Sequence, residues 1–153
     1  MKKFLRFTLT LGASLGASMC VVAVAMAEHS PQHKRHELME AVGDAARPLG
    51  GMLRGKMTFD AGVVMQSLTT WRESAEAFGD LFPAGSETGE GTEAAPEIWT
   101  DRAGFDASLA KFLEDTNTAI AASPQTLDAA RPLIGAAFKN CKGCHDKYRI
   151  EDE

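Results

Sequence analysis

The chain has 153 residues, of which 44% are hydrophobic and 24% charged, a balance typical of one folded domain. Its formal net charge of −5 argues against nucleic acid or an anionic membrane surface as a partner, because both would repel an acidic protein. A basic patch on a partner protein is compatible with this charge.

The first 27 residues have the pattern of a secretory signal peptide. Three basic residues within the first six precede an uncharged stretch that ends in Ala-Met-Ala at 25–27, a small-x-small cleavage site. An uncharged run of about 20 residues could also anchor a protein in a membrane, but polar and glycine residues dilute its apolarity. We predict cleavage after Ala27, export to the periplasm and a mature domain of residues 28–153 that is not membrane-bound. Cleavage removes three basic and no acidic residues, so the charge moves from −5 to −8.

Four segments show helical periodicity, with apolar residues three or four positions apart. The first runs from about His33 to Arg54, and Pro48 is expected to bend it, because proline removes a backbone donor and crowds the preceding turn. The second runs from about Asp60 to Leu81, with Thr58 or Asp60 as its N-cap.

Residues 84–96 have no periodicity and are rich in Gly, Glu, Thr and Ala, which predicts an exposed acidic loop whose charges are simply solvated. The third helix should begin near Thr100 or Asp101 and end at Ser123-Pro124.

The fourth helix should run from about Gln125 or Asp128 to Arg149. If Asp128 caps it, Pro132 falls in the first turn, where no backbone hydrogen bond is lost. Four helices with one long connection predict an all-α fold, an antiparallel up-down four-helix bundle. Its inner faces are rich in Ala and Gly, so the bundle would be underpacked unless a large group filled it.

The segment CKGCHDKYR at 141–149 carries the clearest chemical signal. On a helix, Cys141, Cys144 and His145 share one face, so both sulfurs can attach to one edge of a porphyrin while the imidazole reaches its iron. C-x-x-C-H is the attachment signature of c-type haem. The sequence therefore predicts one covalent haem c near the C-terminal end of the bundle.

Three other uses of two cysteines explain the adjacent histidine less well. A disulfide would close a loop too short to stabilise the fold much, and a thioredoxin-like site would need a neighbouring strand. A zinc site would need a fourth ligand, and the other histidines lie near the opposite end of the chain.

Three segments together resemble the class II cytochromes c, a family that includes cytochrome c prime and low-spin relatives with His/Met iron. They are RHELMEAVG at 35–43, PEIWTDRAGF at 96–105 and CKGCHDKYR at 141–149. The resemblance covers essentially the whole mature chain. It implies thioether bonds at Cys141 and Cys144 and an iron bound by His145.

The resemblance also implies roles for three other residues. It places Arg35 near the haem propionates, Trp99 near the haem edge and Arg149 one turn after the iron ligand. From the sequence alone, a surface charge, a core aromatic and a helix-end cation are equally good readings of these three residues.

Met39 decides between two functions. In low-spin members a methionine at this position binds iron, which raises the potential and suits an electron carrier, and His36 is expected to face outward when Met39 faces inward. If Met39 only fills space, the open site would bind nitric oxide or carbon monoxide. We expect His/Met ligation and a non-enzymatic electron carrier, with redox partner proteins of unknown identity. A homodimer through Leu53, Met57 or Trp71 is possible.

Overall fold

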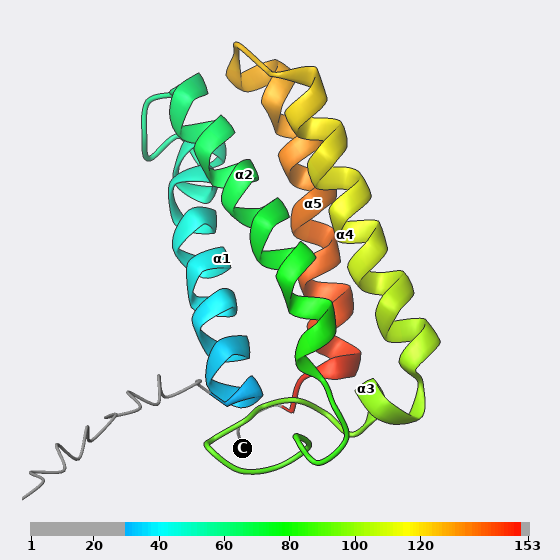
Figure 1. Cartoon of the computed structure of the whole chain (residues 1–153). Coiled ribbons are helices and arrows are strands. Elements are labelled where there is room, and N and C mark those ends of the chain that lie inside the picture. The colour runs from blue at the N-terminus through cyan, green and yellow to red at the C-terminus, as the bar shows by residue number, and fades with distance from the viewer. Residues whose placement is uncertain (1–29, 151–153) are drawn as a thin grey trace, which may run out of the picture.

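The computed structural model describes residues 30–150. Its elements in chain order are α1 (Pro31–Leu53), α2 (Ala61–Phe78), the 3-10 turn η1 (Gly79–Leu81), α3 (Glu97–Thr100), α4 (Arg102–Ala122) and α5 (Leu127–Tyr148). The only β-type pairing among the described residues is an isolated bridge between Ala94 and Arg149. The four long helices lie side by side (Figure 1), which confirms the predicted all-α four-helix bundle.

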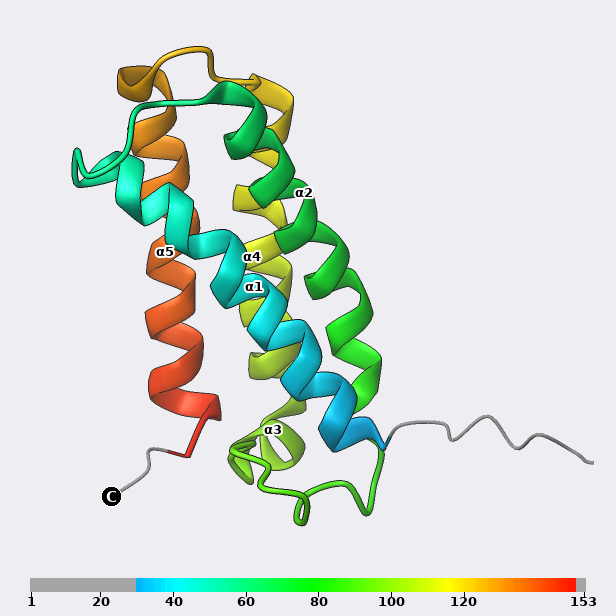
Figure 2. The ribbon, with the colours of Figure 1, turned by 90° about the vertical axis from the view of Figure 1, so that its left-hand side faces the viewer.

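The connections are arranged so that one end of the bundle is covered by irregular chain. The short connections 54–60 and 123–126 lie at one end, whereas residues 79–101 cross the other end, close to the start of α1 and the end of α5 (Figure 1). Seen from the side, α1 and α5 diverge toward this second end (Figure 2).

Each long helix begins at a side chain that caps its free backbone N–H groups. Ser30, Asp60, Asp101 and Thr126 each accept a hydrogen bond from the backbone N–H three residues further on. Of the two N-caps proposed for the second helix, Asp60 is confirmed, and so is the start predicted near Asp101 for the third.

The predicted start of the last helix is corrected by the structure. Thr126 caps α5 through its hydroxyl, and Asp128 lies in the first turn, where a carboxylate favours the helix dipole. Pro132 is therefore the sixth residue of α5, beyond the first turn, and α5 lacks the bond that this position would donate to Asp128. In α1 the helix continues through Pro48 to Leu53.

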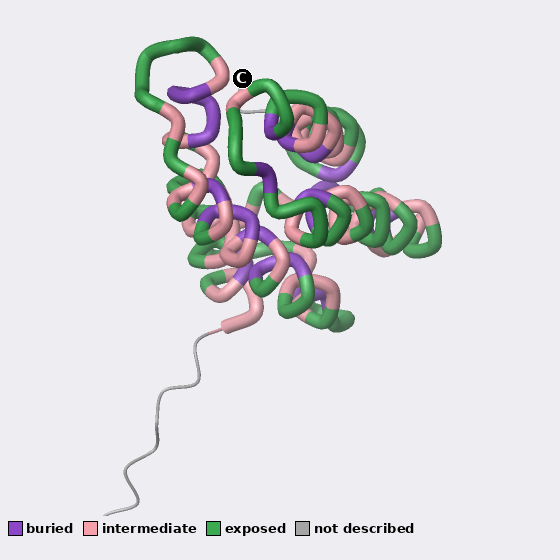
Figure 3. Tube along the Cα trace, turned by 90° about the horizontal axis from the view of Figure 1, so that it is seen from above, coloured by how far each residue is buried: buried purple, intermediate pink, exposed green. Residues whose placement is uncertain are grey.

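The main core lies where the four long helices face one another. Figure 3 shows the buried residues on these inward sides. Trp71 is fully buried, and its indole N–H donates to the carbonyl oxygen of Val42 at 3.0 Å, which ties α2 to α1. Trp71 is thus a core residue, whereas Met57 is 48% exposed.

The loop at 84–96 is not simply an exposed loop. Ser86 and Ala95 are buried, and the short helix α3 follows it, an element that the sequence analysis did not predict. The physical reason is Arg35, which is itself buried and needs acceptors from this segment.

Between residues 30 and 150, no helix has both the length and the apolarity needed to cross a lipid bilayer. The predicted signal peptide lies outside the described residues.

Candidate cofactor site

A cavity of about 400 Å³ lies at the end of the bundle where α1 and α5 diverge. Its walls come mainly from α1, α4, α5 and residues 90–94 of the long connection, with single contributions from Phe78 of α2, Phe82 and Ile98 of α3. The volume lies within the range of about 300–1,000 Å³ that is usual for small-molecule and cofactor sites. The prediction that small residues leave room inside this bundle agrees with the cavity.

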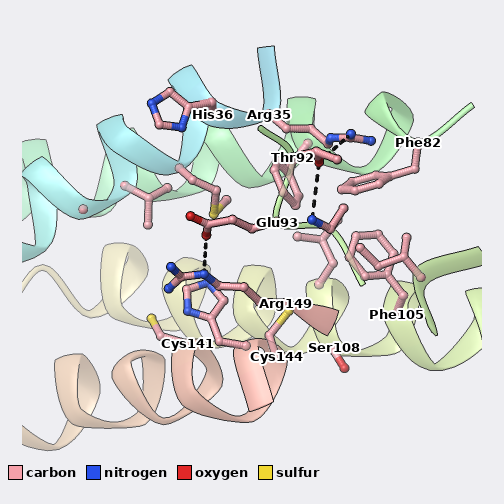
Figure 4. A pocket seen from close by; sticks show the side chains of 18 of the residues that line it. Arg35, His36, Phe82, Thr92, Glu93, Phe105, Ser108, Cys141, Cys144 and Arg149 are labelled. Atoms are coloured by element: carbon pink, nitrogen blue, oxygen red, sulfur yellow. Dashed lines mark hydrogen bonds and ion pairs between the residues drawn. The ribbon is translucent and has the colours of Figure 1, made fainter. Parts of the chain in front are cut away.

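The α5 wall carries the three residues of the haem signature. Cys141, Cys144 and His145 all line the cavity, and Figure 4 shows both cysteines on the same helix. Both are free, half-buried thiols, and burial raises the pKa of each. Their spacing of three residues along one helix puts them on the same face.

The imidazole of His145 lies in surroundings that favour its neutral form. Burial lowers its pKa, and the positive charge of Arg149 lowers it further, against a smaller opposing effect of Glu93 and Asp146. A neutral imidazole keeps a nitrogen lone pair, which is what a metal ligand requires.

The α1 wall faces α5 across the cavity and contributes Arg35, His36 and Met39. His36 is exposed, in line with the expectation that it faces outward, and it also lines the rim of the cavity. Residues three apart on a helix share a face, so Met39 and His36 are presented together. Met39 is partly buried.

The remaining walls are largely aromatic. Five phenylalanines line the cavity, at positions Phe78, Phe82, Phe105, Phe112 and Phe138. Phe82 packs edge-on against Phe105 with ring centroids 4.8 Å apart, and Phe78 packs edge-on against Phe82 at 5.0 Å. Such a wall suits a large flat apolar group.

Arg35 lies at one end of the cavity with most of its donors engaged. It is 5% exposed, and its two terminal nitrogens donate to four acceptors, namely Leu81 O, Ser86 Oγ, Ser86 O and Thr92 Oγ1, at 2.8–3.2 Å. Its Nε–H is buried and has no partner among residues 30–150. This single donor is what Arg35 can still offer to a bound carboxylate.

Trp99 lies behind this wall and does not line the cavity. Its ring packs edge-on against Phe82 at 5.7 Å, and its Nε1 is buried without a partner. The guanidinium of Arg35 lies 4.7 Å from the Phe82 centroid and 5.8 Å from that of Trp99. Two unpartnered N–H groups therefore flank Phe82, which is unusual for buried donors.

Arg149 lines the opposite part of the rim. It caps the C-terminus of α5, its backbone N–H donates to His145 O at 3.2 Å, and its side chain forms an ion pair with Glu93 (Figure 4). The guanidinium thus joins the end of α5 to the long connection.

These residues fit a haem c. Two thiols and a neutral imidazole on one helix face a cavity of suitable volume, aromatic rings line it, and Arg35 leaves a buried donor without a partner. An orphaned buried donor is costly unless a ligand accepts from it.

The sequence analysis missed the contribution of the long connection, of which residues 90–94 line the cavity. It also missed Asn140 and Ser108, which lie in the wall beside the cysteines. The only signal for Asn140 is its position immediately before Cys141. Nothing in the composition of residues 90–94 indicates a pocket wall, because the contacts that place them are with residues more than 50 positions away.

Comparison with known proteins gives a consistent answer. The family model described as Cytochrome C' matches residues 30–149. Cytochrome c' of Rhodopseudomonas palustris is 36% identical over 118 residues, covering 77% of this chain and 80% of the relative. Cytochrome c-556 of Agrobacterium fabrum is 33% identical over 132 residues, covering 86% and 89%.

The solved structure of cytochrome c' from Rhodopseudomonas palustris superposes with a TM-score of 0.78 at 32% identity, covering 82% of this chain and all of that one. Members of the family carry a covalently attached haem c with its iron. With the fold, the cavity and the match over residues 30–149 in agreement, the chain belongs to the cytochrome c' family.

Proposed function

We propose that the protein is a periplasmic one-electron carrier whose haem c is bonded to Cys141 and Cys144 and whose iron is bound by His145 and Met39. The observation that carries this proposal is that α1 and α5 present these residues to one cavity from opposite sides. A haem held between the two helices would have a nitrogen ligand on the α5 side and a thioether on the α1 side.

When bound, haem c supplies an iron that takes up and releases one electron. The residues of the chain determine how well it does so. The aromatic walls give the cavity a largely apolar lining, and the unpartnered Nε–H of Arg35 is available to a haem carboxylate. The Met39 thioether, a soft ligand, would favour the reduced state and raise the potential.

The proposed iron ligands favour an electron carrier rather than an enzyme. The two ligand positions would both be filled by protein, which leaves no open position for a substrate. The encounter with a redox partner protein would be brief and steered by charge, and the acidic mature chain favours a partner with a basic patch. Nucleic acid and anionic membrane surfaces are disfavoured by the same charge.

The alternative is an open iron site that binds nitric oxide or carbon monoxide. It is supported by the relatives, because proteins named cytochrome c' and cytochrome c-556 match this chain at similar identity. In that case Met39 would fill space on the α1 side of the cavity and His145 would be the only protein ligand.

The absorption spectrum of the haem-loaded protein separates the two. The carrier should give a low-spin spectrum with a methionine-to-ferric-iron band, unchanged when carbon monoxide is added to the reduced protein. Met39→Ala should become high-spin and should bind the gas. Met57→Ala, which removes a half-exposed methionine outside the cavity, is the matched control and should behave like the wild type.

A wild-type spectrum that is high-spin and shifts with carbon monoxide would favour the gas-binding alternative. If Met39→Ala stays low-spin, His36→Ala and the double variant identify whether the imidazole at the rim supplies the second ligand. We also propose that the signal peptide is cleaved after Ala27 and that the mature protein can pair as a homodimer through the exposed Met57.

A further inference from the structure

We infer that Arg35 is a positioning residue that folds residues 81–95, here called the strap, over one end of the haem cavity. This inference rests on the proposed haem site and concerns a second role of Arg35, beyond any contact with a haem carboxylate. The strap crosses from α1 to the C-terminal end of α5, and its residues 90–94 form part of the cavity wall.

The strap lacks regular secondary structure and is organised around the guanidinium. Between residues 82 and 93 it forms no helix or strand, and four of its residues have positive φ, namely Gly85, Gly89, Glu90 and Gly91. Its few internal backbone bonds include Ser86 N–H to Pro83 O at 3.2 Å and Thr92 N–H to Gly89 O at 3.0 Å. A chain folded in this way needs acceptors and donors from elsewhere to hold one shape.

Arg35 supplies those donors at two separate turns of the strap. It binds both the hydroxyl and the carbonyl of Ser86, at 3.2 and 2.8 Å, and the hydroxyl of Thr92 at 3.0 Å. The Thr92 hydroxyl in turn accepts from the N–H of Ala94 at 3.3 Å. Through Ser86 and Thr92 a single side chain therefore fixes both ends of the Gly-rich stretch. Figure 4 shows Arg35 and Thr92 of this arrangement.

The planar fork of arginine is essential to this arrangement. Four N–H groups of one guanidinium point in fixed directions, and its face stacks over Phe82 at 4.7 Å. A lysine ammonium keeps the charge but has three donors on one atom and no flat face. It cannot reach both turns at once.

The far end of the strap is fastened independently. Ala95 N–H donates to Tyr148 O at 3.1 Å, and Ile150 N–H donates to Glu93 O at 2.7 Å. The Glu93–Arg149 ion pair lies beside them. Two exposed hydrogen bonds also tie the middle of the strap to α1, from Gln32 Nε2 to Thr88 O at 3.0 Å and from Ser30 Oγ to the Glu90 carboxylate. Loss of Arg35 should therefore loosen residues 84–92, most of all around Ser86 and Thr92, while the strap stays attached at 93–95.

The test compares haem-loaded Arg35→Lys and Arg35→Met with wild type. Hydrogen–deuterium exchange should speed up by about tenfold or more in peptides covering 84–92 of both variants, with α2 and α4 unchanged. Arg47→Lys is the matched control, because Arg47 is an exposed arginine of the same helix paired with Asp44, and it should exchange like wild type.

The reduction potential is a second readout. Loosening of the fold far from the cavity would not change it. Arg35→Lys keeps the charge, yet its potential should fall, because the released strap admits water, which favours the more highly charged ferric state. Arg35→Met should lower the potential further, since it also removes a positive charge. Arg47→Lys should leave it unchanged.

Thr92→Val provides an independent route if the Arg35 variants fail to fold. It removes one acceptor of Arg35 and the acceptor of Ala94 without touching α1, so exchange at 92–94 should rise and the potential should fall. If Arg35→Lys folds but keeps the exchange rates and the reduction potential of the wild type, the inference is overturned. If Arg35→Lys does not fold, the same result in Thr92→Val overturns it. Arg35 would then act only through its charge.

A failure of the proposed function would look different. Wild-type protein without covalent haem would refute the haem site, whereas the exchange measurement would still decide whether Arg35 orders the strap, because all of those bonds are within the protein.

Discussion

The hydroxyl of Tyr148 donates a hydrogen bond to Asp101 Oδ2 at 3.0 Å, so the last residue of α5 is fixed to the residue that caps α4. The same carboxylate accepts the N–H of Gly104 at 3.2 Å and pairs with Lys147. The Tyr148 ring is buried and packs edge-on against Phe105 at 5.4 Å. One carboxylate thus sets the position of the helix end that carries the haem signature.

Tyr148→Phe should lower the free energy of unfolding by about 1 kcal/mol, because it removes the hydroxyl hydrogen bond and leaves the packed ring in place. Urea denaturation followed by circular dichroism measures the change. Lys147→Met, which removes an exposed ion pair to the same carboxylate, is the control and should have the smaller effect. A larger effect of Lys147→Met would mean that the tyrosine hydroxyl contributes little.

Low pH should weaken the contacts of Asp101 with Tyr148 and Lys147. The hydrogen bond from Lys147, followed by that from Tyr148, holds the pKa of Asp101 below its ordinary value. A lowered folded-state pKa means that the stabilisation is complete above the unfolded pKa of about 4 and is lost as the pH falls through the lower folded value.

Asp101→Asn should therefore reduce the free energy of unfolding at about pH 7. It should also flatten the fall in the urea unfolding midpoint between about pH 5 and about pH 2. Asparagine is a suitable replacement because it can still cap α4. Urea midpoints across this range measure the effect. An unchanged pH profile in Asp101→Asn would show that other carboxyl groups control acid unfolding.

Gly104→Ala should destabilise the protein even though alanine is the better helix former. A Cβ at Gly104 would press against the carboxylate of Asp101 and lie 2.5 Å from the Tyr148 hydroxyl oxygen. Gly135→Ala in α5 is the matched control, because nothing lies within 4 Å of its Cβ position. It should stabilise by about 0.5–1 kcal/mol. Thermal unfolding of the two variants should thus shift in opposite directions, and equal shifts would contradict the crowding argument.

Much of the fold was predictable because its determinants are local. Asp60 and Asp101 mark helix starts because an aspartate side chain can accept a hydrogen bond from the backbone N–H three residues further on. The buried stripe of Val64, Leu68 and Trp71 follows from helical periodicity. The cap at Thr126 was missed because Asp128 is an equally good capping residue on sequence alone, and only the backbone conformation distinguishes them.

The residues of the candidate site likewise fall into those that could be predicted from the sequence and those that could not. Cys141, Cys144 and His145 share a face because of their spacing on one helix, so the sequence predicts their common orientation. The partners of Arg35 could not be predicted, since Ser86 and Thr92 lie 51 and 57 residues further along the chain in a segment without periodicity. His36 is exposed as expected, and its place at the cavity rim follows from its spacing of three residues from Met39.

The account depends most on a haem bonded covalently to α5. The protein, produced with a haem-maturation system and then fully denatured, should retain its haem absorbance on the polypeptide. Cys141→Ser combined with Cys144→Ser should lose it under the same treatment. Wild-type polypeptide that becomes colourless on denaturation would contradict the account.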